Sequence, residues 1–267
     1  VGPGNVPVFF GKTADIKFSV DQIIKSKTFD NGTVCASEQA LVLQKFNADN
    51  VIAEFKKRKA YFLNKEEIAR LETTAFNKTQ KVMNISVIGQ SAYDIAKMAG
   101  IQVPEDTTVL IAKLNNVGIE SPLSLEILAP ILAMYLVENF EEAIDKCKEI
   151  NKHGGLGHTV SIFSNNIERI EYFASVMNAG RVIVNTPSSQ GALGGKYNSL
   201  KPSLTLACGS GGKNITTDNI TAGHLLNIQR IAWRKESECL HHFENGSYLN
   251  EKIDAEAFEE ACLKKSE

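Results

Sequence analysis

Short apolar runs alternate with amphipathic helical patterns along this chain, and this alternation restricts its fold more than any other feature. The pattern over residues 13–27, for example, places Ile16, Val20 and Ile23 on one helical face. Strands separated by helices of about 10 to 15 residues are typical of parallel βαβ units. We therefore predict an α/β protein with a mostly parallel sheet flanked by helices. The strand-like runs occupy residues 40–44, 107–114, 158–164 and 181–186.

The charge balance excludes two classes of partner. Twenty-nine basic residues nearly match 31 acidic residues, which gives a net charge of −2. Such a chain lacks the positive charge that nucleic acids or anionic membranes attract. It also has no apolar run of about 18 residues that could cross a bilayer. We therefore expect neither a nucleic acid nor a membrane among its partners.

Cysteine usage indicates the compartment. The five cysteines form no CxxC pair, and the five histidines show no zinc-ligand spacing with them. We therefore expect a reducing, cytoplasmic location and no metal site.

The chain starts at Val1 without an initiator Met or a signal peptide, so we expect a piece of a longer protein. The charged residues 234–267 predict a peripheral tail, with a helix near residues 255–263.

Cys35 is the first candidate for chemistry. It follows the turn signal Asp30-Asn31-Gly32 and precedes the apolar strand pattern of residues 40–44. A turn that delivers a side chain to a strand edge suits an accessible nucleophile, and a thiolate is a strong one. Most free cysteines, however, are small buried apolar residues. The residues alone leave both interpretations open.

A carboxylate and three glycine-rich stretches are further candidates, each with an ordinary structural alternative. Glu126 lies in an apolar, proline-bounded stretch, where its carboxylate needs either a cationic partner or a ligand hydroxyl. His158 follows three glycines at the start of a strand. It could act as an acid or a base, or it could be a structural histidine whose hydrogen bonds are made within the protein. Residues 185–195 follow a strand, where parallel sheets collect function. Residues 205–214 resemble a phosphate-binding loop, but they lack the P-loop spacing and equally fit a tight crossing loop.

Taken in order, these segments resemble the aldehyde dehydrogenase superfamily, specifically its CoA-acylating branch. The likeness is to the aldehyde dehydrogenase half of bifunctional aldehyde–alcohol dehydrogenases, and it covers roughly residues 1–233. The run Cys35-Ala36-Ser37-Glu38-Gln39 is its most specific part. The segments that carry the resemblance are residues 27–32, 35–39, 157–159, 185–191, 202–206 and 208–210.

The resemblance implies a function for each candidate. Cys35 would attack an aldehyde, hydride would pass to NAD, and coenzyme A would then carry the acyl group away from the resulting thioester. His158 would act beside Cys35, and Glu126 would hydrogen-bond the ribose of the dinucleotide. This chemistry needs a lowered cysteine pKa and an oxyanion donor, which the N–H of Cys35 can supply. Gly209 and Gly211 would contact the cofactor. The substrate and CoA loop would comprise Asn185, Thr186, Pro187 and Ser188.

The resemblance also implies a division of the chain. Residues 1–10 would close a dinucleotide-binding domain, 11–215 would form the catalytic domain, and 216–267 would return to the first domain. Most of the dinucleotide-binding domain would be missing, so we expect this chain alone to bind NAD poorly and to turn over little. Leu125 and Ile127 replace charged and imidazole neighbours of the family glutamate, which affects the local polarity and the aldehyde accepted. The tail from residue 234 does not resemble the start of an alcohol dehydrogenase domain.

Three alternatives stay open at this point. A hydrolytic aldehyde dehydrogenase would resolve the thioester with water instead of CoA. An assembly domain would keep only an interaction role, and a thiol-based binding domain would have no turnover. For the lead hypothesis we expect a short-chain aldehyde as substrate and a homo-oligomer in the full-length protein.

Overall fold

The computed structural model describes residues 2–77 and 79–234. Residues 1–225 form one compact unit and residues 226–267 a second. In the second unit, the described residues 226–234 carry neither helix nor strand. The helix expected near residues 255–263 lies outside the described residues.

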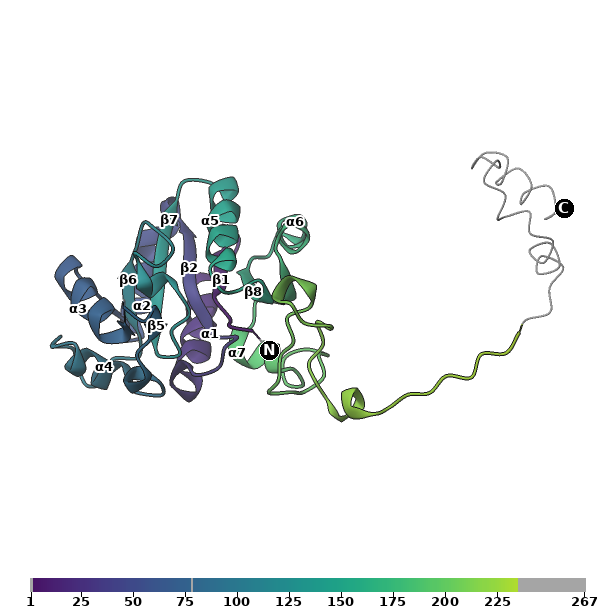
Figure 1. The fold of residues 1–267 in the computed structure, drawn as a ribbon. Helices are drawn as coiled ribbons and strands as arrows, with labels where there is room; N and C mark the ends of the chain where they lie inside the picture. Colours follow the sequence, from purple (N-terminus) through teal and green to yellow (C-terminus); the bar gives the residue numbers. More distant parts are fainter. Residues whose placement is uncertain (1, 78, 235–267) are drawn as a thin grey trace, which may run out of the picture. The chain divides into compact units, whose positions relative to one another are not determined.

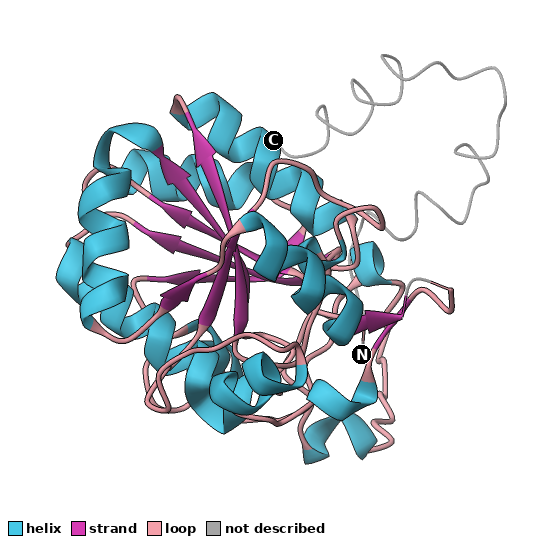
Figure 2. Cartoon of the chain, turned by 90° about the vertical axis from the view of Figure 1, so that its left-hand side faces the viewer, coloured by secondary structure: helices cyan, strands magenta, loops and turns pink. Residues whose placement is uncertain are grey.

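A seven-stranded sheet forms the first unit, in the order β3-β6-β7-β2-β1-β8-β9. All neighbouring strands in it pair in parallel, and they fan out between layers of helices (Figures 1 and 2). The predicted α/β fold with a mostly parallel sheet is therefore confirmed. The strands of this sheet are β1 (Val6–Phe10), β2 (Glu38–Gln44), β3 (Tyr61–Phe62), β6 (Leu110–Lys113), β7 (Ile131–Val137), β8 (Gly157–Phe163) and β9 (Ala179–Val184).

The helices begin at side chains that cap their first turn. Asn139 accepts a hydrogen bond from the N–H of Glu142, and Asn64 forms a capping box with Glu67, as the sequence predicts. Asp15 caps its helix instead of lying in the first turn. The α-helices are α1 (Ile16–Thr28), α2 (Ala48–Lys57), α3 (Lys65–Ala75), α4 (Ala92–Met98), α5 (Phe140–Lys152), α6 (Ile167–Val176) and α7 (Ser188–Leu193).

The core lies on both faces of the sheet, because successive strand residues point in opposite directions. Val8 and Phe10 of β1 belong to a buried cluster that also contains residues of α1 and α2. Phe9, between them, packs against Phe140 of α5 and Phe173 of α6, with ring centroids 5.3 and 6.2 Å apart. All five residues of β1 are buried. This strand therefore connects the two helical layers.

Strand β1 lies in the middle of the main sheet, where it pairs with β2 on one side and β8 on the other. Both of its edges are paired and all of its residues are buried, so it is a central strand. The expectation that residues 1–10 close a dinucleotide-binding domain stays a prediction. The boundaries expected at residues 11–215 and 216–267 stay predictions.

A small hairpin lies outside the main sheet. Strands β4 (Phe76–Asn77) and β5 (Val82–Met83) pair antiparallel directly after α3.

Within the described residues, no helix combines the length and the apolar character that crossing a membrane requires.

Candidate active site at the amino-terminal edge of the central strands

Four neighbouring strands each bring one group to the same edge of the sheet. Glu126 precedes β7, Cys35 precedes β2, Gly4 precedes β1, and His158 is near the start of β8. These are the four central strands, in the order β7-β2-β1-β8. Residues far apart in sequence therefore meet because the amino-terminal ends of parallel strands lie side by side.

A strained turn presents Cys35 at this edge. Asp30, Asn31 and Gly32 have φ angles of 49°, 48° and 74°, in the left-handed region. Gly32 has a second constraint, because a Cβ there would lie 2.7 Å from the carbonyl oxygen of Ala129. The side chain of Asn31 donates a 2.8 Å hydrogen bond to the carbonyl of Gly89, which ties the turn down. The turn that follows α1 thus holds the half-buried Cys35 in place.

Cys35 and His158 form a hydrogen-bonded pair. The Nε2 of His158 lies 3.2 Å from the Sγ of Cys35, and its Nδ1 lies 2.9 Å from the Oγ1 of Thr159. The His158 side chain is fully buried. Burial, together with the positive charge of Arg181, lowers the pKa of His158 to about 4, so the imidazole is neutral at pH 7. A neutral imidazole can accept the thiol proton.

The cysteine itself is not poised as a thiolate. Burial is the largest cause that raises the pKa of Cys35, and the negative charge of Glu126 adds to it. The N–H of Cys35 and the guanidinium of Arg181 act in the opposite direction but do not outweigh burial. This result differs from the lowered cysteine pKa that the family chemistry led us to expect. The resting pair is therefore a thiol and a neutral imidazole.

Glu126 lies beside this pair with one oxygen open. Its Oε1 accepts a 2.7 Å hydrogen bond from the N–H of Gly4, and a Cβ on Gly4 would lie 2.0 Å from the carbonyl oxygen of Cys35. Burial raises the pKa of Glu126, while Lys27 and the Gly4 N–H oppose that shift. No donor among the described residues reaches Oε2. That oxygen can accept a hydrogen bond from a ligand hydroxyl.

Arg181 supports the edge of the site from β9. Its guanidinium donates to the carbonyl oxygens of Ala207, at 3.0 Å, and Thr217, at 3.2 Å. The side chain is 4% exposed, and burial lowers the pKa of the guanidinium. Arg181 therefore holds the segment after residue 200 against β9 and adds a positive charge near Cys35.

The glycine loop of residues 205–214 has the geometry of a tight crossing loop. A Cβ on Gly211 would lie 2.2 Å from the side chain of Asn178, and Gly209 has a φ of 60°. The N–H of Gly209 donates to the carbonyl of Thr216 just beyond the loop, and the N–H of Gly212 donates to the carbonyls of Cys208 and Gly209. A phosphate-binding loop needs such N–H groups free. The cofactor-binding role expected for Gly209 and Gly211 stays a prediction that this geometry does not favour.

The predicted substrate and CoA loop is held by contacts within the protein. The side chain of Asn185 bonds both backbone groups of Ser164 at the far end of β8, at 2.8 and 2.9 Å. Thr186 donates to the carbonyl of Val184, and Pro187 precedes the first turn of α7. The N–H of Ser188 donates to Glu38. None of these hydrogen bonds involves Cys35 or His158. The binding role of the four residues stays a prediction.

Sequence reasoning missed several residues that build the site. Lys27, Glu38, Gln39 and Arg181 are at least 96% buried, although their side chains are charged or amide-bearing. A signal was present for Glu38 and Gln39, because the four residues that follow them in the strand are apolar. Gly4 carried no signal of its own.

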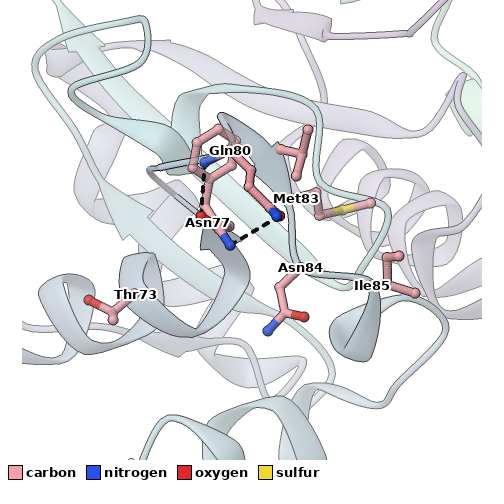
Figure 3. A pocket seen from close by; sticks show the side chains of 8 residues that line it. Thr73, Asn77, Gln80, Met83, Asn84 and Ile85 are labelled. Atoms are coloured by element: carbon pink, nitrogen blue, oxygen red, sulfur yellow. Dashed lines mark hydrogen bonds between the residues drawn. The ribbon is translucent and has the colours of Figure 1, made fainter.

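A separate cavity lies away from this chemistry. It measures about 510 Å³ and is formed by the end of α3 and the β4–β5 hairpin (Figure 3). Its described lining residues are apolar, hydroxyl or amide, with Asn77 and Gln80 bonded to each other. These described lining residues include neither a thiol nor a group that titrates near neutral pH, so they lack the chemistry of the Cys35 site.

The fold and the site place the chain in a known class. The model of the aldehyde dehydrogenase family matches residues 2–201. The chain therefore belongs to the aldehyde dehydrogenase family.

Its relatives lie in the CoA-acylating branch. The chain is 44% identical over 241 residues to an aldehyde-alcohol dehydrogenase of Clostridium acetobutylicum, a match that covers 89% of this chain and 28% of that protein. An acetylating aldehyde dehydrogenase from Geobacillus thermoglucosidasius has a similar structure, with a TM-score of 0.85, 44% identity, and coverage of 89% of this chain and 52% of that one.

A second similar structure contains a ligand. It is a propionaldehyde dehydrogenase of Rhodopseudomonas palustris with bound propionyl-CoA, at a TM-score of 0.68 and 25% identity, covering 80% of this chain and 46% of that one. The chain thus spans about half the length of these solved structures and less than a third of the Clostridium acetobutylicum relative. The resemblance to the CoA-acylating branch is confirmed by these relatives.

Proposed function

We propose that this chain carries the catalytic part of a CoA-acylating, NAD-dependent aldehyde dehydrogenase that acts on a short-chain aldehyde. The observation that carries the proposal is the 3.2 Å contact between the Sγ of Cys35 and the Nε2 of His158. A nucleophile and a base within hydrogen-bond reach are the minimum for covalent acyl chemistry. The relatives named as acetylating or holding propionyl-CoA support CoA as the acyl acceptor.

The pair performs the first chemical step. His158 takes the thiol proton at Nε2 while the sulfur of Cys35 bonds the aldehyde carbon, and the carbonyl π bond opens to an oxyanion. The backbone N–H of Cys35 is the donor that we propose for this oxyanion. The product is a thiohemiacetal on Cys35, which becomes a thioester once its hydride leaves. NAD, when bound, supplies the acceptor for that hydride.

The second step releases the acyl group. After His158 releases its first proton to solvent, its neutral imidazole can take the proton of the CoA thiol as the CoA sulfur attacks the thioester carbon. The C–S bond to Cys35 then breaks, acyl-CoA forms, and the proton returns to the sulfur of Cys35. Thiohemiacetal formation, hydride transfer and thioester exchange are each reversible, so the sequence also runs in reverse from acyl-CoA to aldehyde.

The residues present fit a dinucleotide. The open Oε2 of Glu126 faces no protein donor in the described part of the chain, and a ribose hydroxyl is a suitable donor for a carboxylate. Glu126 would hold this hydroxyl and orient the cofactor next to Cys35. The bond from Gly4 fixes the other oxygen and thereby the rotation of the carboxylate.

The test is a product assay on the intact protein. We expect a thioester product that forms only when aldehyde, NAD and CoA are all present. Cys35→Ala should abolish it, and Cys147→Ala, at a buried thiol of α5, should leave it intact. Release of free acid without CoA would support the hydrolytic alternative, and no turnover in any mixture would overturn the proposal.

We propose in addition that the intact protein is a cytoplasmic homo-oligomer. The free thiols of Cys35, Cys147 and Cys208 in the described part of the chain support the location. Light scattering of the intact protein tests the assembly, and a monodisperse monomer would contradict it.

A further inference from the structure

Two buried polar pairs flank the turn that carries Cys35. Ser26 and Lys27 lie at the end of α1, and Glu38 and Gln39 lie at the start of β2. All four side chains are at most 2% exposed. The turn with the nucleophile is therefore fixed at both of its ends by polar groups that solvent does not reach.

One residue from each pair binds the segment that carries Glu126. The Nζ of Lys27 donates to the Oε1 of Gln39 at 3.1 Å and to the carbonyl oxygen of Ile127 at 3.4 Å. The same Oε1 of Gln39 accepts the N–H of Ile127 at 3.2 Å. Both backbone groups of Ile127 are thus held, and we name this set of three contacts the Ile127 clamp. Because Ile127 follows Glu126 directly, the clamp fixes the backbone from which the carboxylate extends.

The other two residues bind α7 instead. The Oγ of Ser26 accepts the N–H of Ser189 at 2.8 Å, and Glu38 accepts the N–H of Ser188 at 2.9 Å. The two sets of contacts are adjacent in sequence but separate in what they hold. This separation provides a matched control, because one set can be cut without the other.

A buried ammonium is a costly way to fill space. Burial lowers the pKa of Lys27 to about 7, against the attraction of Glu38 on β2 and Glu126 beyond it. An apolar side chain of similar volume would pack there without this cost. The cost is consistent with a role in the site beyond packing.

We propose that Lys27 is a positioning residue for Glu126, which it orients through the Ile127 clamp. The proposal rests on the proposed function, in which Glu126 holds the cofactor ribose. Lys27 touches neither cofactor nor substrate in this role. It couples the turn of Cys35 to the carboxylate, so that nucleophile and cofactor are aligned by one buried cation.

Amide hydrogen exchange on this chain tests the clamp without any cofactor. In Lys27→Met we expect exchange at the N–H groups of Ile127 and Gly4 to accelerate about tenfold or more, because the clamp and the carboxylate lose their fixed position. The N–H groups of Ser188 and Ser189 should keep their rates. In Ser26→Ala the pattern should reverse, with Ser189 faster and Ile127 unchanged.

Binding of NAD to the intact protein, measured by calorimetry, tests the consequence. We expect about tenfold weaker binding in Lys27→Met and in Glu126→Ala, and no further loss in the double variant, because Lys27 acts through Glu126. Multiplied losses in the double variant would overturn the positioning role. Unchanged exchange at Ile127 and Gly4 in Lys27→Met would overturn it independently.

Two further arms keep the outcomes distinct. If Glu126→Ala binds NAD as tightly as the unaltered protein, the proposed function of Glu126 fails, while the exchange data still decide on the clamp. If Lys27→Met does not fold, Gln39→Leu removes the acceptor of the Ile127 N–H and must accelerate its exchange. A Gln39→Leu protein with normal exchange at Ile127 would contradict the inference.

Discussion

The sulfur of Cys35 and the Nε2 of His158 lie 3.2 Å apart in surroundings that disfavour charge on either group. Burial raises the pKa of the thiol and lowers that of the imidazole. A thiol beside a neutral base can be activated when substrate arrives, while at rest it is a weak nucleophile. The pair therefore keeps the thiol weakly reactive at rest and activates it only when substrate arrives.

Alkylation of Cys35 tests this resting state. We expect its rate with iodoacetamide to rise continuously from about pH 6 to pH 9, because burial raises the pKa of the thiol and keeps it protonated at rest. His158→Gln should slow alkylation at neutral pH by at least about tenfold, since the proton acceptor is lost. Mass spectrometry of labelled peptides measures both rates.

The control for this experiment is Cys147. It is fully buried on α5, so it should label more slowly than Cys35 in the folded protein. A rate plateau at acidic pH would mark a thiolate–imidazolium pair and would contradict the thiol and neutral imidazole described above.

His158 also predicts how stability depends on pH. Its pKa is about 4 in the folded protein and 6.5 when unfolded, so the unfolded chain binds more protons between these values. Stability from this residue is therefore complete above pH 6.5 and is lost as the pH falls toward 4, by about 3 kcal/mol. The free energy of unfolding is measured over this range for the unaltered protein and for His158→Gln. The advantage of the unaltered protein should be about 3 kcal/mol smaller at pH 4 than above pH 6.5. A constant difference would refute the shift.

Residue identity alone could predict part of this site. Cys35, His158 and Glu126 follow from the resemblance, and the structure brings all three to one edge of the sheet. The ionisation of Cys35 could not be predicted, because it depends on how deeply the turn is buried. The clamp residue Lys27 was hidden as well, since a lysine at a helix end is normally solvent-exposed.

At the level of elements, local signals determine where helices begin. The Asn64–Glu67 capping box and the Asn139 cap both follow from the sequence and are present in the structure. Strand β7 escaped prediction because its continuous apolar run has no periodicity to separate strand from helix. The pairing of β1 was also missed, because strand order depends on contacts between distant segments.

The capping box of α3 gives a prediction at this scale. Asn64→Ala should lower the free energy of unfolding by about 1 kcal/mol, because the N–H of Glu67 loses its acceptor at the helix start. Urea denaturation measures the change. The exposed neighbour Lys65 serves as control, and Lys65→Ala should stay within about 0.5 kcal/mol of the unaltered protein. Equal losses in the two variants would argue against the cap.

Glu67→Ala should cost more than Asn64→Ala. Glu67 accepts both the N–H of Asn64 at 2.8 Å and the hydroxyl of Tyr61 at 2.9 Å. Its removal leaves two donors without their acceptor, and one of them connects α3 to β3. Thermal melting of the two variants side by side should rank Glu67→Ala as the less stable, and the opposite ranking would contradict the double role.

For the whole molecule, β1 is the strand on which both helical layers depend. Phe9 is fully buried between the rings of Phe140 and Phe173, so Phe9→Ala opens a cavity next to α5 and α6 at once. We expect Phe9→Ala to lower the free energy of unfolding by about 3 to 5 kcal/mol. Phe46 is 58% exposed, so Phe46→Ala is the matched control. It should lower the free energy of unfolding by less than about 1 kcal/mol.

Denaturant unfolding monitored by circular dichroism measures this difference. A large loss in Phe9→Ala shows that residues 6–10 are integral to the stability of the sheet, as their pairing with β2 and β8 requires. Similar small losses in both phenylalanine variants would instead favour the earlier expectation that this segment belongs to a neighbouring domain.

The separation of Cys35 and His158 by 123 positions has a consequence for synthesis. At about 5 to 20 residues per second, a ribosome needs roughly 6 to 25 s to reach the histidine after it has made the cysteine. During that interval the nascent chain carries an ordinary thiol with no base beside it. Base-assisted attack by Cys35 therefore becomes possible only when β8 docks against β1 and brings His158 beside the thiol.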